Sequence, residues 1–281
     1  MLAFMVLVWS VNFVVAKNAL GQFSPLMLGA LRFTCGGLFI LPIYLWGKRG
    51  EPLPDFSASW KVLGIGVLGV GLNQFLFLLG LVRTTVAHSA ILIAMTPMMV
   101  LLLSAWVGHE RITRTKLAGL AMATSGVGVL QGRALLGGHG SMVGDLFVLL
   151  AGLTFAMFTV AGKEIRERYD ALTINTFAYT GSAVLLAPVT LWLAAATDFS
   201  TVRWTGWLSV VYMAIFPSVI AYLIFYHALR YMPSSQVSRL AYLQPFLATL
   251  FAVPLLGERV TLSLIAGGAL VLAGVFWTER A

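Results

Sequence analysis

Residues 81–113, LVRTTVAHSAILIAMTPMMVLLLSAWVGHERIT, are matched 148 positions later by residues 229–261, LRYMPSSQVSRLAYLQPFLATLFAVPLLGERVT. The same register aligns a proline and a Glu-Arg pair in both copies: Pro97 with Pro245, and Glu110-Arg111 with Glu258-Arg259. Chance matches in an apolar sequence would involve leucine and alanine rather than a proline and a charged pair. The sequence therefore predicts a duplicated unit of about half the chain, with domains at residues 1–133 and 134–281.

The composition is that of an integral membrane protein. Of the 281 residues, 59% are hydrophobic and only 10% are charged, and the mean hydropathy is +0.92. A water-soluble domain could not bury so much apolar surface. The net charge of +8 would suggest a nucleic-acid partner in a soluble protein, but in a membrane protein it reflects basic loops, so no nucleic-acid partner is expected. The single cysteine, Cys35, excludes an internal disulfide and a cysteine-based zinc site, and no metal or cofactor is expected.

Ten apolar stretches remain when the sequence is divided at its charged and Gly/Pro/Asp-bearing breaks. Each approaches the roughly 20 residues that a helix needs to cross a bilayer, and none alternates with the period of a barrel strand. The first stretch lacks the basic start and small-residue cleavage site of a signal peptide, so it is expected to be a mature span. We expect an all-α polytopic membrane protein with ten transmembrane helices near residues 2–18, 25–46, 60–82, 85–107, 114–131, 142–162, 172–196, 204–229, 234–256 and 260–278.

The distribution of positive charge predicts the orientation. If the N-terminus is cytoplasmic, the inside loops carry eleven lysines and arginines and the outside loops carry five. This bias favours cytoplasmic N- and C-termini. Five helices per repeat is an odd number, so the two repeats are expected to be inverted in the membrane. Inverted repeats with a shared interface are common in secondary transporters, whose substrate site lies between them near the midplane.

Three features resemble the EamA family of the drug/metabolite transporter superfamily, and the likeness extends over the whole chain: the opening Trp9-Ser-Val-Asn12, the block from Pro97 to Glu110-Arg111, and its copy from Pro245 to Glu258-Arg259. The resemblance implies a multi-pass exporter of small metabolites in a bacterial inner membrane that works by alternating access. It also implies a central cavity lined mainly by helices 1, 3, 4, 6, 8 and 9. Within the family the chain is most similar to exporters of aromatic and other neutral amino acids.

Polar side chains in the middle of spans identify candidate cavity residues. In helix 1, Trp9 and Asn12 share a face at i and i+3, and Ser10 lies at the same depth. A buried amide in hydrocarbon needs a partner, so these residues either line a cavity or join neighbouring helices. The same alternatives apply to Asn73 and Gln74 in helix 3. Further candidates come from helices 8 and 9: Tyr222, Ser238, Tyr242 and Gln244.

Two prolines and several ionisable groups complete the candidate site. Pro97 and Pro245 each remove a backbone hydrogen bond in mid-helix, which predicts either a hinge or a static kink. Arg239 either pairs with a substrate carboxylate or extends its guanidinium to the headgroups, and the same alternatives apply to Arg32. His88 is either structural or a proton carrier.

Acidic and small residues have simpler expected roles. No Asp or Glu falls in the middle of a predicted span, so the buried carboxylate with which multidrug pumps bind cations is not expected. A zwitterion needs no such counter-ion, which favours passive or exchange-type export. Glu110 and Glu258 are expected to pair at the interface or to cap the helix that follows. Four glycines predict close helix packing, or a dimer contact, on one face of helices 5 and 10: Gly119, Gly126, Gly267 and Gly274.

The leading hypothesis is a secondary transporter that exports aromatic and other neutral amino acids. The alternatives are broad-specificity efflux of xenobiotics and a polytopic membrane enzyme, although the sequence has no His-Glu-x-x-His, Gly-x-Ser-x-Gly or paired intramembrane aspartates, so no enzymatic activity is expected. The expected partners are an amino acid or related metabolite and the lipid bilayer, with a monomer favoured.

Overall fold

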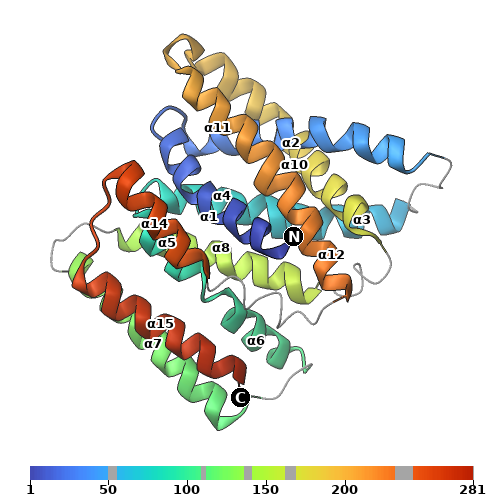
Figure 1. Cartoon of the computed structure of the whole chain (residues 1–281). Coiled ribbons are helices and arrows are strands. Elements are labelled where there is room, and N and C mark those ends of the chain that lie inside the picture. The colour runs from blue at the N-terminus through green and yellow to red at the C-terminus, as the bar shows by residue number, and fades with distance from the viewer. Residues whose placement is uncertain (50–55, 109–111, 136–140, 162–168, 232–242, 281) are drawn as a thin grey trace.

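A computed structural model of the protein describes residues 1–49, 56–108, 112–135, 141–161, 169–231 and 243–280 (Figure 1). Within these ranges every regular element is helical, which confirms the expected all-α class. In chain order the elements are α1 (Leu2–Ala19), α2 (Pro25–Gly47), α3 (Phe56–Gly66), η1 (Val67–Leu72), α4 (Asn73–Leu81), α5 (Val86–Ile93), α6 (Thr96–Trp106), α7 (Arg114–Leu135), α8 (Met142–Ala161), α10 (Ala171–Ala196), η2 (Phe199–Thr201), α11 (Trp204–Ile215), η3 (Phe216–Ile220), α12 (Ala221–Tyr231), α14 (Gln244–Leu256) and α15 (Leu262–Arg280).

Most of these helices are suited to a bilayer. In the described part of the chain, seven are long and apolar enough to cross a membrane: Leu2–Ala19, Pro25–Gly47, Trp60–Leu81, Val86–Trp106, Met142–Ala161, Ala171–Ala196 and Trp204–Ala228. Two shorter apolar helices cover Gln244–Leu256 and Leu262–Thr278. Large apolar side chains remain exposed on the bundle, as at Trp106 and Trp192, and lipid is the environment that covers such a surface. The chain is therefore a multi-pass membrane protein.

Side-chain caps set the start of several helices. The hydroxyl of Ser24 accepts a hydrogen bond from the Met27 N–H at 3.2 Å, and Pro25 occupies the first position of α2. Thr85 caps α5 in the same way, accepting from the His88 N–H at 3.1 Å. Each cap satisfies one of the first N–H groups of a helix, which have no partner within the helix itself.

Asp170 caps α10 and also joins it to α2. Its carboxylate accepts from the Thr173 N–H at 2.9 Å and lies 2.7 Å from the Lys48 ammonium. Partial burial raises the pKa of the Asp170 carboxyl, but the Lys48 ammonium and the Thr173 donors outweigh it and hold the pKa below its usual value. A depressed carboxyl pKa stabilises the fold above the unfolded pKa of about 4, and this contribution is lost as the pH falls through the native pKa.

We expect Asp170→Ala to lower the free energy of unfolding at pH 7 by about 1–2 kcal/mol, because it removes the cap and the ion pair. Asp170→Asn keeps a capping oxygen and should lose less than about 1 kcal/mol. Thermal unfolding in detergent measures both changes. Below the native pKa the wild type and Asp170→Asn should converge, and an undiminished difference there would contradict the assigned ion pair.

Two π-helical segments interrupt spans at matching places in the two halves. A shift of 148 residues moves η1 onto residues 215–220, and η3 occupies Phe216–Ile220. In η1, a Cβ added to Gly69 would overlap the Cβ of Phe158, so α8 can approach only a glycine there. In η3, the carbonyl of Pro217 accepts a hydrogen bond from the Trp9 indole N–H at 3.3 Å. Such segments leave backbone groups free for contacts outside their own helix.

The two prolines predicted to act as a hinge or a static kink lie in the first turns of two helices. The span Val86–Trp106 is divided into α5 and α6, and Pro97 lies in the first turn of α6, just after the break. Pro245 likewise lies in the first turn of α14. A proline is tolerated at these positions because its nitrogen would have no helical acceptor.

The packing places α7 and α15 side by side at one edge of the bundle and α2, α10 and α11 at the opposite edge (Figure 1). Between them, α1 packs on α14, α11 and α12, while α8 packs on α4, α5 and α6. Three clusters of buried apolar side chains fill the interior.

The four glycines of α7 and α15 confirm the expected close packing. A Cβ added to Gly119 would lie 2.6 Å from the carbonyl oxygen of Gly274, and one added to Gly126 would lie 2.7 Å from that of Gly267. These contacts join residues of the same chain, so the glycine face is already occupied by helix packing within the protein.

Candidate functional site

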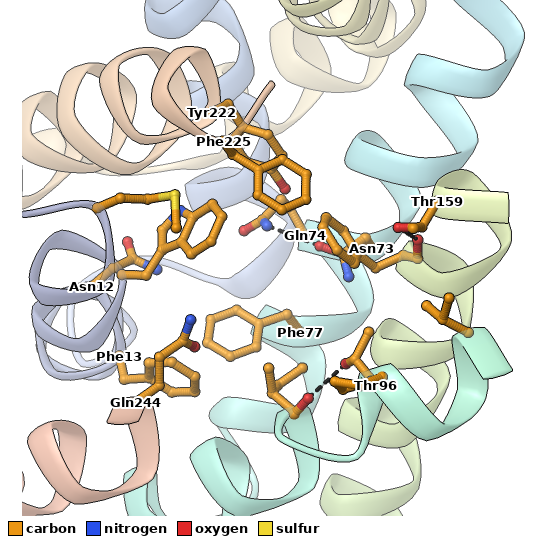
Figure 2. Close-up of a pocket in the computed structure, with 16 residues that line it drawn as sticks. Asn12, Phe13, Asn73, Gln74, Phe77, Thr96, Thr159, Tyr222, Phe225 and Gln244 are labelled. Atoms are coloured by element: carbon orange, nitrogen blue, oxygen red, sulfur yellow. Dashed lines mark hydrogen bonds between the residues drawn. The ribbon is translucent and has the colours of Figure 1, made fainter. Parts of the chain in front are cut away.

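A cavity of about 140 Å³ lies among the central helices. Its lining comes from α1, α4, α5, α6, α8, α12 and α14 (Figure 2). In terms of the expected spans these are helices 1, 3, 4, 6, 8 and 9, the set that the family resemblance implies.

Aromatic rings form much of the cavity wall. The Trp9 ring lies 5.7 Å from that of Tyr222 in an edge-on arrangement and 5.6 Å from that of Phe225. Phe13 and Phe77 meet edge to face with their centroids 5.1 Å apart. Because the Trp9 indole is also held by the Pro217 carbonyl, this wall offers a fixed apolar surface on which a flat ligand can stack.

A chain of hydrogen bonds orients the amides of α4. The Arg32 guanidinium donates to the Gln74 Oε1 at 2.6 Å, Gln74 Nε2 donates to the Asn73 Oδ1 at 2.9 Å, and Asn73 Nδ2 donates to the Ala151 carbonyl at 2.6 Å. A guanidinium can only donate, so the oxygen of Gln74 must face it. Each amide in the chain is thereby fixed in one orientation.

Asn12 brings a buried, unpaired acceptor to the cavity wall. Its side chain is buried, and its Oδ1 has no hydrogen-bond partner in the part of the chain that the structure describes. The hydroxyl of Thr96, by contrast, donates at 2.6 Å to the carbonyl of Ile93, the last residue of α5. A buried amide oxygen without a partner is costly unless a ligand or water supplies a donor.

The structure brings most of the sequence-derived candidates into the cavity. Those that line it are Trp9, Asn12, Asn73, Gln74, Pro97, Tyr222 and Gln244. Ser238, Arg239 and Tyr242 lie outside the described residues. Pro245 is buried at the start of α14 beside Gln244 but does not line the cavity.

Two candidates do not line this cavity, and their contacts agree with the structural alternative given for each. Ser10 is fully buried and donates to the Val6 carbonyl of its own helix at 2.8 Å. His88 lies at the start of α5, where its Nδ1 is 3.3 Å from the Asp145 carboxylate. Thr84 donates to the other oxygen of Asp145 at 2.5 Å. Asp145 lies in the first turn of α8, where its side chain is buried in contact with Thr84 and His88.

For Arg32, the sequence predicted either contact with a substrate carboxylate or extension of the guanidinium to the headgroups. The structure instead places the side chain in the protein interior, outside the cavity lining. Its side chain is only 1% exposed, and its Nε donates to the Ser218 hydroxyl at 2.8 Å. With its other contact to Gln74, the guanidinium lies one side chain behind the cavity wall.

Glu258 caps a helix of the other half rather than the helix that follows it. Its two carboxylate oxygens accept from the N–H groups of Val86 and Ala87, at 2.6 and 3.1 Å, at the start of α5. The same corner of the chain is held by Lys17, which donates to the carbonyls of Leu81 and Thr84, both at 2.6 Å. Lys17 is one turn beyond the cavity residue Phe13, so these contacts join the end of α1 to the connection between α4 and α5 next to the cavity. Glu110 lies outside the described residues.

Sequence analysis did not identify the other residues of the lining, which are mostly apolar. The missed residues are Met5, Phe13, Phe77, Ile93, Thr96, Val100, Phe155, Thr159 and Phe225. Several lie three or four positions from a polar candidate, as Phe13 does from Trp9 and Phe77 from Asn73. Extending each candidate along its helix face would have found them.

A bundle of membrane-crossing helices around a small cavity with fixed aromatic and amide groups defines a transport protein for small molecules. The profile of the EamA-like transporter family matches residues 1–131 and 142–280, and the chain therefore belongs to this family. It is a membrane transporter.

Relatives of similar length agree with this assignment. An uncharacterized transporter of Archaeoglobus fulgidus is 28% identical over 99% of this chain and 96% of its own. A probable amino-acid metabolite efflux pump of Salmonella typhimurium is 29% identical over 96% of this chain and 91% of its own. A probable terminal-alkyne amino-acid exporter of Streptantibioticus cattleyicolor is 28% identical over 98% and 91%. One solved crystal structure, 25% identical, superposes with a TM-score of 0.71 and covers 99% of this chain and 96% of its own.

Proposed function

We propose that this EamA-family transporter exports aromatic and other neutral amino acids, or closely related metabolites, by alternating access. The observation that carries the proposal is the cavity itself: aromatic walls around Trp9, a few amides, and no acidic side chain among its described lining residues. Such a site suits a flat, neutral or zwitterionic ligand better than a lipophilic cation, which would need a buried counter-ion. Two relatives named for amino-acid export support the same substrate class.

The proposed architecture is ten transmembrane helices in two inverted five-helix repeats, residues 1–133 and 134–281. The two matches to the family profile fall on either side of this boundary. The glycine contacts between α7 and α15 are reciprocal, since Gly119 meets Gly274 and Gly126 meets Gly267. A two-fold axis relating the repeats would produce this reciprocity, because the 148-residue shift converts each contact into the other.

The proposed location is a bacterial inner membrane with both termini in the cytoplasm. The excess of lysine and arginine on one side supports this orientation. The corner that contains Lys17 and Glu258 then faces outward, and the contacts there close the outer end of the cavity. Alternating access requires these contacts to break when the outer end opens.

Counterflow in proteoliposomes without an ion gradient tests the proposed function. Vesicles loaded with unlabelled phenylalanine should transiently accumulate labelled phenylalanine, and loading with tryptophan, threonine or methionine defines the range. Trp9→Ala should reduce the initial rate at least about tenfold, because it removes a large buried wall of the cavity. Trp192→Ala is the matched control, since Trp192 is 70% exposed and lies outside the cavity.

Three results would contradict the proposal. Uptake of a lipophilic cation without amino-acid uptake would favour efflux of xenobiotics. Uptake that begins only when a proton gradient is imposed would contradict uncoupled exchange and direct attention to His88 and Asp145. Equal rates for Trp9→Ala and Trp192→Ala would place the substrate elsewhere.

A further inference from the structure

We infer that the buried Arg32 guanidinium, acting through the Gln74 amide, makes the cavity select ligands that carry a carboxylate over the same ligands without it. This selectivity rests on the proposed function, because it names the group by which that cavity would hold an amino acid. Arg32 does not line the cavity, so its role is that of a positioning residue.

The positive charge of Arg32 has only neutral partners among the described contacts. Its guanidinium donates to the Ser218 hydroxyl and the Gln74 carbonyl oxygen, and the side chain is 1% exposed. The acidic side chains that the structure describes all have contacts elsewhere: Asp145 with Thr84 and His88, Asp170 with Lys48, Asp198 with Ser200, and Glu258 with the amides of Val86 and Ala87. A buried cation without an anion raises the electrostatic potential of the space beside it.

Gln74 conveys this charge to the cavity surface. Its Oε1 accepts from Arg32, so its amide nitrogen is the end of the side chain turned away from the guanidinium. Asn73 is fixed in the same sense, because its Oδ1 accepts from Gln74 and its Nδ2 donates to Ala151. Asn73 keeps one further N–H, and the second N–H of Gln74 is shared with the hydroxyl of Tyr222, which is itself a donor on the cavity wall. This wall therefore offers donors within a positive potential, which is the environment that a carboxylate requires.

The opposite polarity lies on α1. Asn12 Oδ1 is a buried acceptor without a partner in the described part of the chain. Trp9, one turn away, contributes an aromatic ring that can attract an ammonium group. Figure 2 shows Asn12 on α1 and Gln74 on α4 as separate parts of the cavity wall. A zwitterion can thus place its carboxylate at Gln74 and its ammonium at Asn12.

Competition for counterflow measures the selectivity directly. Phenylalanine and phenethylamine share the ring and the amine and differ in the carboxylate. We expect phenylalanine to inhibit counterflow by the purified full-length protein in proteoliposomes at a concentration at least about tenfold lower than phenethylamine does. This ratio corresponds to the attraction between one carboxylate charge and the Arg32 charge at intermediate distance and dielectric.

Variants identify the source of that ratio. Arg32→Gln removes the charge and should bring the ratio of the two inhibitory concentrations close to one, while Arg32→Lys keeps the charge and should restore part of it. Gln74→Glu places a carboxylate against Arg32 and should reverse the preference toward the amine. Gln74→Glu therefore tests the effect of the Arg32 charge on selectivity even if Arg32→Gln does not fold. A purely structural role for Arg32 would lower all rates together and leave the ratio unchanged.

The outcomes separate this selectivity from the proposed function. Phenylalanine counterflow that phenethylamine inhibits equally well would overturn the role of Arg32 and leave amino-acid export standing. A ratio that Arg32→Gln or Gln74→Glu leaves unchanged would overturn it too. A third outcome is that no amino acid is carried, but a different carboxylate ligand competes better than its carboxylate-free analogue. If Arg32→Gln abolishes that difference, the role of Arg32 stands and the proposed substrate is wrong.

Discussion

Gly126→Leu is expected to prevent the formation of a stable, monodisperse protein, whereas Gly128→Leu, two residues further along α7, should leave stability unchanged or slightly increased. A Cβ on Gly126 would lie 2.7 Å from both the Gly267 carbonyl oxygen and the Val271 nitrogen. Both of these are backbone atoms of α15, so neither can turn aside and the helices must separate. Overpacking in a core costs typically about 1–3 kcal/mol, and a backbone contact on this scale should cost more.

Gly128 provides the matched control because an added Cβ there meets nothing within 4 Å. Both substitutions favour the helix by up to about 1 kcal/mol, so their difference isolates the contact between α7 and α15. Size-exclusion chromatography and thermal unfolding in detergent measure it. Similar profiles for the two variants would show that the two helices do not pack as described.

In the membrane orientation proposed above, Glu258→Ala is expected to open the cavity toward the outer face. The carboxylate of Glu258 holds two N–H groups of α5 across the two halves of the chain, and hydrogen bonds to a charged group contribute roughly 1.5–3 kcal/mol each. Hydrogen bonds to water replace part of this free energy when the contact between Glu258 and α5 breaks. Even a net change of about 1.4 kcal/mol shifts the balance between closed and open states tenfold.

A cysteine in the cavity reports the change. In a Cys35→Ala background, Phe13→Cys should react with a membrane-impermeant maleimide added outside at least about ten times faster when Glu258 is replaced by alanine. Asp198→Ala is the matched control, since this carboxylate bonds only within its own short turn to Ser200 among the contacts described for it. Glu258→Gln keeps one acceptor oxygen and should give an intermediate rate. Equal labelling of Glu258→Ala and Asp198→Ala would exclude Glu258 from the closure of the outer end.

The helices and part of the cavity were predictable because membrane burial limits the options for each residue. The breaks at Pro25 and Asp170 predicted helix starts near residues 25 and 172, and the structure begins α2 at Pro25 and α10 at Ala171, each after a cap that acts within three residues. At least one of Asn73 and Gln74 was predicted to face the interior, because two adjacent amides are too costly to face lipid together, and both line the cavity.

The remaining contacts depend on residues far apart in the sequence. Ser10 and Asn12 are both polar and lie at the same depth. The Ser10 hydroxyl donates to the Val6 carbonyl one turn back, whereas the Asn12 Oδ1 has no partner in the described part of the chain. His88 and Asp145 are 57 positions apart, and nothing local indicates their pairing. The depth of Arg32 alone suggested contact with the headgroups, whereas its position depends on Gln74 and Ser218.

The contact between Arg32 and Ser218 also bears on how the protein is made. Synthesis runs from the N-terminus, and Ser218 emerges 186 residues after Arg32. Arg32 is seven positions after the start of α2, about 10 Å into the helix at 1.5 Å per residue. Until its partners arrive, the guanidinium can reach the headgroups along its flexible stem. We therefore expect the nascent α2 to enter the bilayer in a shallow position and to reach its final depth only after η3, which carries Ser218, has been synthesised.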